Sequence, residues 1–187
     1  MTPEEAEELF ARTGAMLTGH FLLSSGRHSD RYVQKARVLE DPMVATRLAR
    51  EIASWFDGVE AVVAPAVGAI ALGFAVASVA GARSLFAERE VGRMELRRGF
   101  VVSPGERTLV VEDVVTTGAS AREVWDLVGE LGAERLGVAA LIDRTTAPPP
   151  FPLRAVLRVE AGTWDRATCP SCARGLPLDS PGSRHLA

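Results

Sequence analysis

The chain of 187 residues is 47% hydrophobic and 24% charged, with a formal net charge of −3 at pH 7. Its length suits one domain with a sizeable core, and its composition excludes a largely disordered or collagen-like chain. It contains no uncharged apolar run of about 18 residues, which argues against a membrane span. The acidic N-terminus is unlike a secretory signal and two cysteines are too few for a disulfide framework, so we expect a cytoplasmic protein.

The cationic residues are almost all arginine, because only Lys35 among the 21 lysine and arginine residues is a lysine. Asparagine is absent, and Gln34 is the only glutamine. A GC-rich genome or a hot environment would each produce this bias. The negative net charge and the lack of a basic stripe with interleaved aromatic residues argue against a nucleic-acid partner.

The N-terminal part of the chain predicts a helix, two strands and a second helix. A capping threonine, a proline and an acid predict the first helix over residues 2–12. Residues 14–34 contain short apolar runs broken by glycines, which indicate a strand, a polar loop at 24–30 and another strand. An Asp-Pro pair then begins a helix over residues 41–56, whose apolar positions recur at helical spacing.

Beyond residue 60 the pattern alternates between strands and helices. The predicted strands are residues 61–64, 84–87, 108–111, 136–142 and 155–159, and the predicted helices are residues 68–79 and 119–132. Such alternation predicts an α/β fold with a central parallel sheet flanked by helices on both faces. Residues 89–98 are charged and show neither helical nor strand periodicity convincingly. We expect the three prolines at 148–150 to form a stiff connection and to end the main sheet.

The most informative segment is LVVEDVVTTGAS, residues 109–120. An apolar strand ends in Glu112 and Asp113, and a loop of small and hydroxylic residues leads into a helix that begins near Ala119. Ligands bind at the carboxyl ends of parallel strands, and a helix N-terminus offers free N–H groups to a phosphate. The two acids suit the vicinal hydroxyls of a sugar, or a metal ion. The segment therefore predicts a phosphorylated sugar as ligand.

Two structural interpretations of this segment compete with that hypothesis. Threonine and glycine between a strand and a helix are common turn residues, and the paired acids could serve only to cap the helix. Two acids set directly before the loop make these interpretations less favourable than binding of a sugar phosphate.

The segment EDVVTTGAS resembles the phosphoribosyl-pyrophosphate fingerprint of the type I phosphoribosyltransferases. The resemblance implies that family's fold, with Glu112 and Asp113 holding the ribose hydroxyls and residues 116–120 holding the 5′-phosphate. The binding residues that it implies for phosphoribosyl pyrophosphate are Glu112, Asp113, Val114, Val115, Thr116, Thr117, Gly118, Ala119 and Ser120. Purine, pyrimidine and regulatory members share this fingerprint, so by itself it names only a superfamily.

Residues 19–34 resemble the N-terminal segment of the orotate phosphoribosyltransferases, which forms a small hood over the base. The residues that match its SGR-x-S core are Ser25, Gly26, Arg27 and Ser29. Tyr32 falls where an aromatic side chain stacks on orotate, and Arg144 matches the arginine that meets orotate. The guanidinium of an arginine makes two parallel hydrogen bonds to a carboxylate. Orotate carries a carboxylate and a purine does not, so Arg144 favours orotate. The implied orotate-binding residues are Ser25, Gly26, Arg27, Tyr32, Thr116 and Arg144.

The mobile catalytic loop of that family contains lysines and a histidine, whereas the corresponding loop here is shorter and has neither. Its candidate residues for the pyrophosphate site are Arg89, Arg93, Arg97 and Arg98. Arginine supplies positive charge to a pyrophosphate leaving group but cannot donate a proton at neutral pH. An alternative interpretation is that the Arg97-Arg98 pair lies only on a solvated face.

The resemblance covers nearly the whole chain and implies transfer of ribose 5-phosphate from phosphoribosyl pyrophosphate to orotate, in pyrimidine biosynthesis. It implies Mg²⁺ held mainly through the ligand, with no direct protein metal site, and a homodimer. We expect one phosphoribosyltransferase domain over residues 1–187, with a hood over 1–40 and a C-terminal tail over 160–187. The alternatives are a purine phosphoribosyltransferase and a non-catalytic regulator of the same fold.

Cys169 and Cys172 have the two-residue spacing of a zinc knuckle, but a structural zinc site needs four ligands. The three histidines are His20 and His28, near the N-terminus, and His185, near the C-terminus. Cys169, Cys172 and His185 together supply only three ligands. We therefore expect the two cysteines to be structural, with no zinc site within one chain. A dimer that shares two cysteine pairs is the less favoured alternative.

Overall fold

The residues that the computed structural model describes are 1–23, 25–160 and 162–181. They form two compact units. The first unit contains residues 1–6 and 39–159, and the second contains residues 7–38 together with the chain from residue 160 onward. Among the described residues, every helix is too short or too polar to cross a lipid bilayer.

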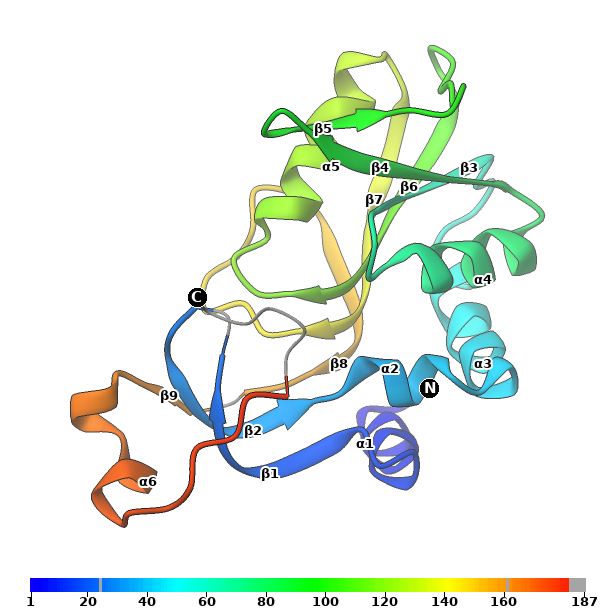
Figure 1. Cartoon of the computed structure of the whole chain (residues 1–187). Coiled ribbons are helices and arrows are strands. Elements are labelled where there is room, and N and C mark those ends of the chain that lie inside the picture. The colour runs from blue at the N-terminus through cyan, green and yellow to red at the C-terminus, as the bar shows by residue number, and fades with distance from the viewer. Residues whose placement is uncertain (24, 161, 182–187) are drawn as a thin grey trace. The chain divides into compact units, whose positions relative to one another are not determined.

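A six-stranded sheet forms the centre of the first unit (Figure 1). Its strands, in spatial order, are β5 (Arg93–Leu96), β4 (Arg83–Glu90), β3 (Ala61–Pro65), β6 (Arg107–Val115), β7 (Glu134–Asp143) and β8 (Leu153–Arg158). Strands β4, β3, β6, β7 and β8 run parallel, whereas β5 is antiparallel to β4. The predicted central parallel sheet is therefore confirmed.

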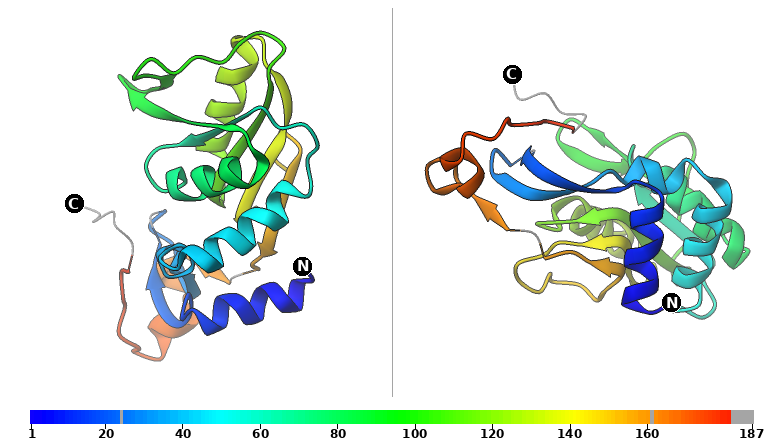
Figure 2. Two further views of the ribbon diagram at one scale, coloured as in Figure 1. Left: turned by 90° about the vertical axis from the view of Figure 1, so that its right-hand side faces the viewer. Right: turned by 90° about the horizontal axis from the view of Figure 1, so that it is seen from below.

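Helices cover both faces of this sheet (Figure 2), as predicted. On one face lie α3 (Pro42–Ala53) and α4 (Ile70–Ala80), and on the other lies α5 (Ala119–Glu130). Successive side chains of a strand point to opposite faces. Val63 of β3 accordingly packs in a buried cluster with valines of α5, whereas the next residue, Ala64, lies against Gly73 of α4.

A three-stranded antiparallel sheet, in the order β1-β2-β9, forms the centre of the second unit. Its elements are β1 (Met16–Leu22), β2 (His28–Val33), β9 (Thr163–Trp164), the 3-10 helix η1 (Arg166–Thr168) and α6 (Pro170–Ala173). The Leu22 N–H donates to the Asp179 carbonyl and the Asp179 N–H donates to the His20 carbonyl, both at 2.8 Å. The predicted hood segment and the C-terminal tail therefore belong to one unit. Two further helices contain residues of both units, α1 (Pro3–Arg12) and α2 (Lys35–Leu39).

Two local predictions are wrong, and one segment for which no element was predicted forms part of the sheet. That segment, residues 89–98, includes most of a hairpin of β4 and β5, and charged side chains along this edge conceal the alternation of a strand. Strand β6 continues to Val115, so Glu112 and Asp113 lie inside the strand and not at its end. Strand β8 pairs with β7, so the prolines at 148–150 connect two strands of the main sheet instead of ending it.

Gly73 allows α4 to pack closely on β3. A Cβ atom at this position would lie 2.9 Å from the Ala64 Cβ. Overpacking of this kind costs about 1–3 kcal/mol, and the better helix propensity of alanine offsets about 1 kcal/mol. We expect Gly73→Ala to lower the free energy of unfolding by up to about 2 kcal/mol in a urea titration. The matched change Ser78→Ala, at an exposed position of α4, should raise it slightly, and equal behaviour of the two variants would contradict the packing argument.

Candidate active site

Two buried carboxylates lie close to the carboxyl end of β6. Glu112 and Asp113 expose only 6% and 4% of their surface. The Glu112 carboxylate accepts hydrogen bonds from the Asp113 N–H (3.0 Å) and the Ser120 hydroxyl (2.6 Å). An Asp113 oxygen accepts one from the Val114 N–H (2.6 Å). These bonds hold two acids at the end of the sheet where parallel sheets bind ligands.

The loop after β6 leads directly into the N-terminus of α5. Thr116 and Thr117 are exposed, and Gly118 occupies the N-cap position with a φ angle of 74°. A Cβ at Gly118 would also lie 3.2 Å from the Phe151 ring, so this position favours glycine. The first turn of α5 carries no acidic side chain. Its N–H groups and the positive end of the helix dipole therefore suit an anion.

Arg144 follows β7, the strand beside β6. Its N–H donates to the Val115 carbonyl (2.8 Å), so Arg144 and the loop that begins at Thr116 start from neighbouring strand ends. The preceding residue, Asp143, accepts hydrogen bonds from the Thr145 N–H and the Arg158 guanidinium, each at 2.8 Å. The backbone on both sides of Arg144 is thus fixed.

Arg158 is a residue of this region that sequence reasoning missed. It lies opposite Asp143 in the pairing of β7 with β8, and its guanidinium also donates to the Thr145 carbonyl (3.3 Å). The two partners of the ion pair are 15 positions apart in sequence, so only the strand register reveals it. A cavity of about 350 Å³ opens beside this ion pair.

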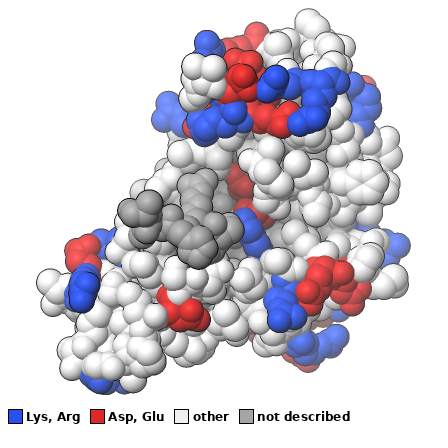
Figure 3. All heavy atoms as spheres, in the orientation of Figure 1, with Lys and Arg blue, Asp and Glu red and all other residues white. Residues whose placement is uncertain are grey.

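The four candidate arginines of the catalytic loop lie on the β4–β5 hairpin and just after it. Three of them contact acids: Arg89 with Glu123 (2.8 Å), Arg97 with Glu90 (2.5 Å) and Arg98 with both oxygens of Glu88 (2.8 and 2.9 Å). The hydrogen bonds from Arg98 lower the pKa of the Glu88 carboxyl below its usual value. Across the described part of the chain, no ion pair involves Arg93. Figure 3 shows positive and negative side chains intermixed over this hairpin.

The second unit carries the other residues predicted to contact orotate, which are Ser25, Gly26, Arg27 and Tyr32. The Arg27 guanidinium donates to the Thr163 carbonyl (2.7 Å) and contacts the Asp165 carboxylate (3.4 Å). The Tyr32 ring lies 5.7 Å from the Phe21 ring. The contacts of Arg27 join the segment between β1 and β2 to β9 and to the residue that follows β9. Thr116 and Arg144, the two remaining orotate candidates, belong to the first unit.

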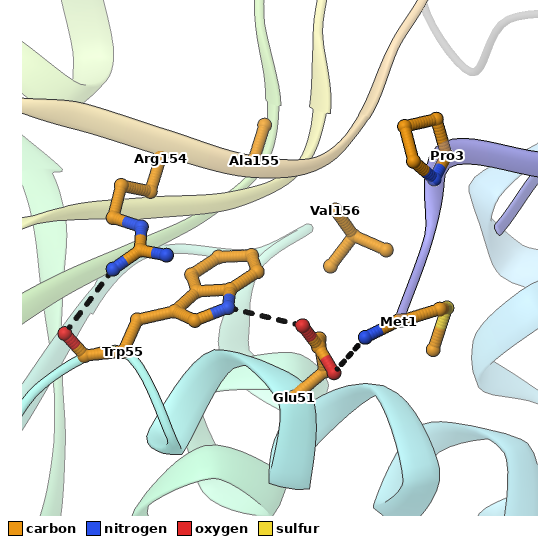
Figure 4. Close-up of a pocket in the computed structure, with 7 residues that line it drawn as sticks. All are labelled: Met1, Pro3, Glu51, Trp55, Arg154, Ala155 and Val156. Atoms are coloured by element: carbon orange, nitrogen blue, oxygen red, sulfur yellow. Dashed lines mark hydrogen bonds and ion pairs between the residues drawn. The ribbon is translucent and has the colours of Figure 1, made fainter.

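A second cavity, of about 310 Å³, lies between the end of α3 and β8 (Figure 4). Glu51 accepts hydrogen bonds from the Trp55 indole N–H (3.1 Å) and the Met1 amino group (2.8 Å), and the latter bond lowers the pKa of Glu51. Arg154 donates to the Trp55 carbonyl (3.4 Å) and stacks over its ring. Because these groups satisfy one another and none belongs to the loop after β6, we assign this cavity to packing.

Two groups of side chains are suited to hold a cation. Glu112 and Asp113 offer the oxygen ligands that Mg²⁺ prefers. The other group places its ligand atoms within 4.8 Å of one another and consists of His20, His28, Cys169 and Cys172. The expectation of plain structural cysteines overlooked two of these ligands, because the histidines are distant in sequence. His185 lies outside the described residues.

The sequence matches the phosphoribosyl transferase domain family over residues 39–151, more than half of the chain and all within the first unit. It is 48% identical over 190 residues to the orotate phosphoribosyltransferase of Desulforamulus reducens, covering 100% of both chains. The enzyme of that name from Thermotoga maritima is 47% identical, with 96% of this chain and 98% of the relative covered. A solved orotate phosphoribosyltransferase of Mycobacterium tuberculosis, in complex with inorganic phosphate, is 31% identical with a TM-score of 0.61, covering 84% of this chain and 96% of that chain. The chain therefore belongs to the orotate phosphoribosyltransferase family.

Proposed function

We propose that this chain transfers the ribose 5-phosphate group of phosphoribosyl pyrophosphate to orotate, forming orotidine 5′-phosphate and releasing pyrophosphate. The observation that carries the proposal is the meeting of two buried acids, a helix N-terminus and an arginine at one end of the parallel sheet. The acids can bind the ribose diol, and the helix N-terminus can bind the 5′-phosphate. The arginine can bind the carboxylate of orotate. Identity to enzymes of this name over the whole chain supports the same reaction.

The site residues act on opposite ends of the ribose 5-phosphate group. Glu112 and Asp113 accept hydrogen bonds from the 2′- and 3′-hydroxyls, because ionised carboxylates are acceptors only. The N–H groups of the loop from Thr116 and of the first turn of α5 bind the 5′-phosphate. Ser120 donates to Glu112 and so links the two parts of the site. Binding at both ends fixes C1 of the ribose relative to the incoming base.

The reaction is a displacement at C1 of the ribose. The electron pair of orotate N1 forms the new N–C bond, the electrons of the C–O bond leave with pyrophosphate, and the N1 proton passes to the departing pyrophosphate. Positive charge grows on the ribose near the buried acids, while the hairpin arginines stabilise the negative charge that grows on pyrophosphate. Mg²⁺ held mainly through the substrate would supply Lewis-acid neutralisation of the leaving group, and Glu112 and Asp113 are the protein residues that would help to hold it.

Consumption of orotate tests the proposed function. The full-length protein with phosphoribosyl pyrophosphate and Mg²⁺ should cause a loss of orotate absorbance, with equimolar release of pyrophosphate. Adenine and guanine, supplied in parallel reactions, should not be consumed, because neither carries a carboxylate for Arg144. Consumption of a purine instead would favour the alternative enzyme, and consumption of no base would favour the non-catalytic regulator.

Arg93 should be the hairpin arginine most available to pyrophosphate, since carboxylates contact the other three candidates. We expect Arg93→Gln to lower kcat/KM for phosphoribosyl pyrophosphate about tenfold, the effect of losing one charged hydrogen bond. The KM for orotate should be unchanged. Steady-state kinetics checks both values, with Arg50→Gln, an exposed change on α3, as the matched control. Identical constants for Arg93→Gln and wild type would remove Arg93 from the pyrophosphate site.

We extend the proposal to a homodimer in which the hairpin arginines serve the site of the neighbouring copy, as the family resemblance implies. Under this arrangement, Arg93→Gln chains mixed with chains that lack the ribose acids should regain activity, because mixed dimers contain one intact site. Activity no greater than that of the Arg93→Gln chains alone would place the hairpin in its own chain's site.

A further inference from the structure

The second unit contains a buried group of imidazole and thiol side chains that phosphoribosyl transfer does not use. His20 lies on β1 and His28 begins β2, whereas Cys169 and Cys172 come from the C-terminal segment around α6. The exposed fractions of His20, His28 and Cys169 are only 5%, 3% and 3%. All four residues belong to the same compact unit.

The separations between the ligand atoms are close to those around a tetrahedrally coordinated metal ion. Cys172 Sγ lies 3.3 Å from His28 Nδ1 and 3.6 Å from His20 Nε2, and Cys169 Sγ lies 3.5 Å from His20 Nε2. A tetrahedral zinc ion, with bonds of about 2.0 Å to nitrogen and about 2.3 Å to sulfur, sets nitrogen–sulfur separations at about 3.6 Å. The two nitrogens lie 2.8 Å apart. Movement of one ring by roughly 0.5 Å would bring them to the separation of about 3.3 Å that an ion requires.

His20 already makes the outer hydrogen bond of a metal ligand. Its Nδ1 lies 3.0 Å from the Leu176 carbonyl oxygen. Because a carbonyl can only accept, Nδ1 must carry the proton, and Nε2 therefore presents a lone pair to the cluster. Metal-bound histidines characteristically donate their second ring N–H to a carbonyl or carboxylate in this way, which fixes the tautomer and the orientation of the ring.

Without an ion, three groups converge on this one lone pair. His28 Nδ1 and both sulfur atoms lie within 3.6 Å of His20 Nε2. The lone pair can accept one good hydrogen bond, and thiols are weak donors. A divalent cation at the centre would instead satisfy all four ligand atoms together. Two imidazoles and two thiolates in a tetrahedral arrangement are a ligand set that suits Zn²⁺.

We propose that His20 Nε2, His28 Nδ1 and the sulfur atoms of Cys169 and Cys172 bind one zinc ion in a structural site. Four protein ligands close the coordination shell, so the ion has no open position for a substrate. It joins the β1–β2 hairpin to the C-terminal segment in a small unit, where a metal can replace the stability that a large core would give. Residues 25–27 lie between the strands that carry the two histidines, so the ion also restrains this segment.

Metal analysis of the full-length chain tests the proposal directly. Protein purified without a metal-affinity tag or a chelator should contain about one zinc ion per chain and bind zinc with a dissociation constant below about 100 nM at pH 7. Replacement by Co²⁺ should give the visible absorption of a tetrahedral ion and a thiolate-to-cobalt charge-transfer band. Removal of zinc should lower the Tm, and zinc, but not Mg²⁺, should restore it.

Variants then locate the site. Cys169→Ser combined with Cys172→Ser should reduce bound zinc at least about tenfold, because serine hydroxyls are poor zinc ligands. His185→Gln, which changes the remaining histidine of the sequence, should retain the full zinc content and serves as the matched control. If the cysteine variant fails to fold, the zinc content and the cobalt spectrum of the wild-type chain still decide the question.

Three results would overturn the proposal. The first is a wild-type chain that lacks zinc and binds it no more tightly than about 10 µM. The second is stoichiometric iron in place of zinc. The third is a disulfide between Cys169 and Cys172 in folded, metal-free protein, since both cysteines are free thiols in the structure. None of these outcomes bears on orotate consumption, so the proposed function stands or falls separately.

Discussion

Replacing Glu112 by Gln and Asp113 by Asn together should remove nearly all turnover and leave the fold intact. The amides keep the size of the acids, but they lose the negative charge that lies beside the developing positive charge on the ribose. Loss of one preorganised electrostatic group at a transition state costs about 100-fold or more in kcat, so we expect the double variant to lose at least about 1,000-fold. Rates of orotate consumption at saturating substrates provide the measurement.

The control for this experiment changes charge in the same way elsewhere in the first unit. Asp126→Asn with Glu134→Gln removes two exposed carboxylates, which pair with Arg122 and Arg107. Its turnover should stay within about twofold of wild type, because exposed ion pairs contribute little. Thermal denaturation should show that both double variants are folded. Near wild-type turnover of the Glu112→Gln, Asp113→Asn chain would refute the role of these acids in binding ribose.

Arg144→Gln should raise the KM for orotate by about 30-fold to 150-fold, because a charged hydrogen-bonding pair contributes about 2–3 kcal/mol. The KM for phosphoribosyl pyrophosphate should change little, since Arg144 acts on the carboxylate of the base. Arg144→Lys should restore only part of the affinity, because an ammonium group cannot make the two parallel bonds of a guanidinium. Steady-state kinetics with each substrate varied in turn gives both constants.

Arg50→Gln again provides the matched control, because it removes an exposed arginine of the same unit and should leave both constants unchanged. A rise in the KM for orotate without a rise in the KM for phosphoribosyl pyrophosphate distinguishes loss of orotate binding from general misfolding of the site. If Arg144→Gln raised the KM for phosphoribosyl pyrophosphate as much as the KM for orotate, the Arg144 side chain would position the loop after β6 and would not bind the base.

The central sheet could be predicted because its inner strands are buried on both faces and form continuous apolar runs. Strand β3, for example, is buried along its whole length. The β4–β5 hairpin could not be predicted, since its turn at Val91 and Gly92, both with positive φ, joins strands in which half of the side chains are charged. The place of β8 also escaped prediction, because a run of prolines is equally compatible with a connection and with an end.

The part of the candidate site that could be predicted consists of residues that are contiguous in sequence. Residues 109–120 bring the acids, the loop and the helix N-terminus together through local structure alone. The ion pair between Asp143 and Arg158 depends instead on the register of two strands. The four residues of the proposed zinc site come from segments far apart in sequence, and His28 and Cys172 are 144 positions apart. Such a site has no local sequence motif, and the spacing of the two cysteines does not indicate which histidines lie beside them.

The strand pairing of the second unit also sets an order of events during synthesis. Residues 7–38 leave the ribosome before the strands of the first unit, whereas β9 and Asp179, to which they form backbone bonds, leave it after those strands. The first unit possesses all its strands once β8 has been made, so it can fold earlier. Residues 7–38 must therefore wait for β9 and Asp179, so a segment that is translated before the first unit is completed after it.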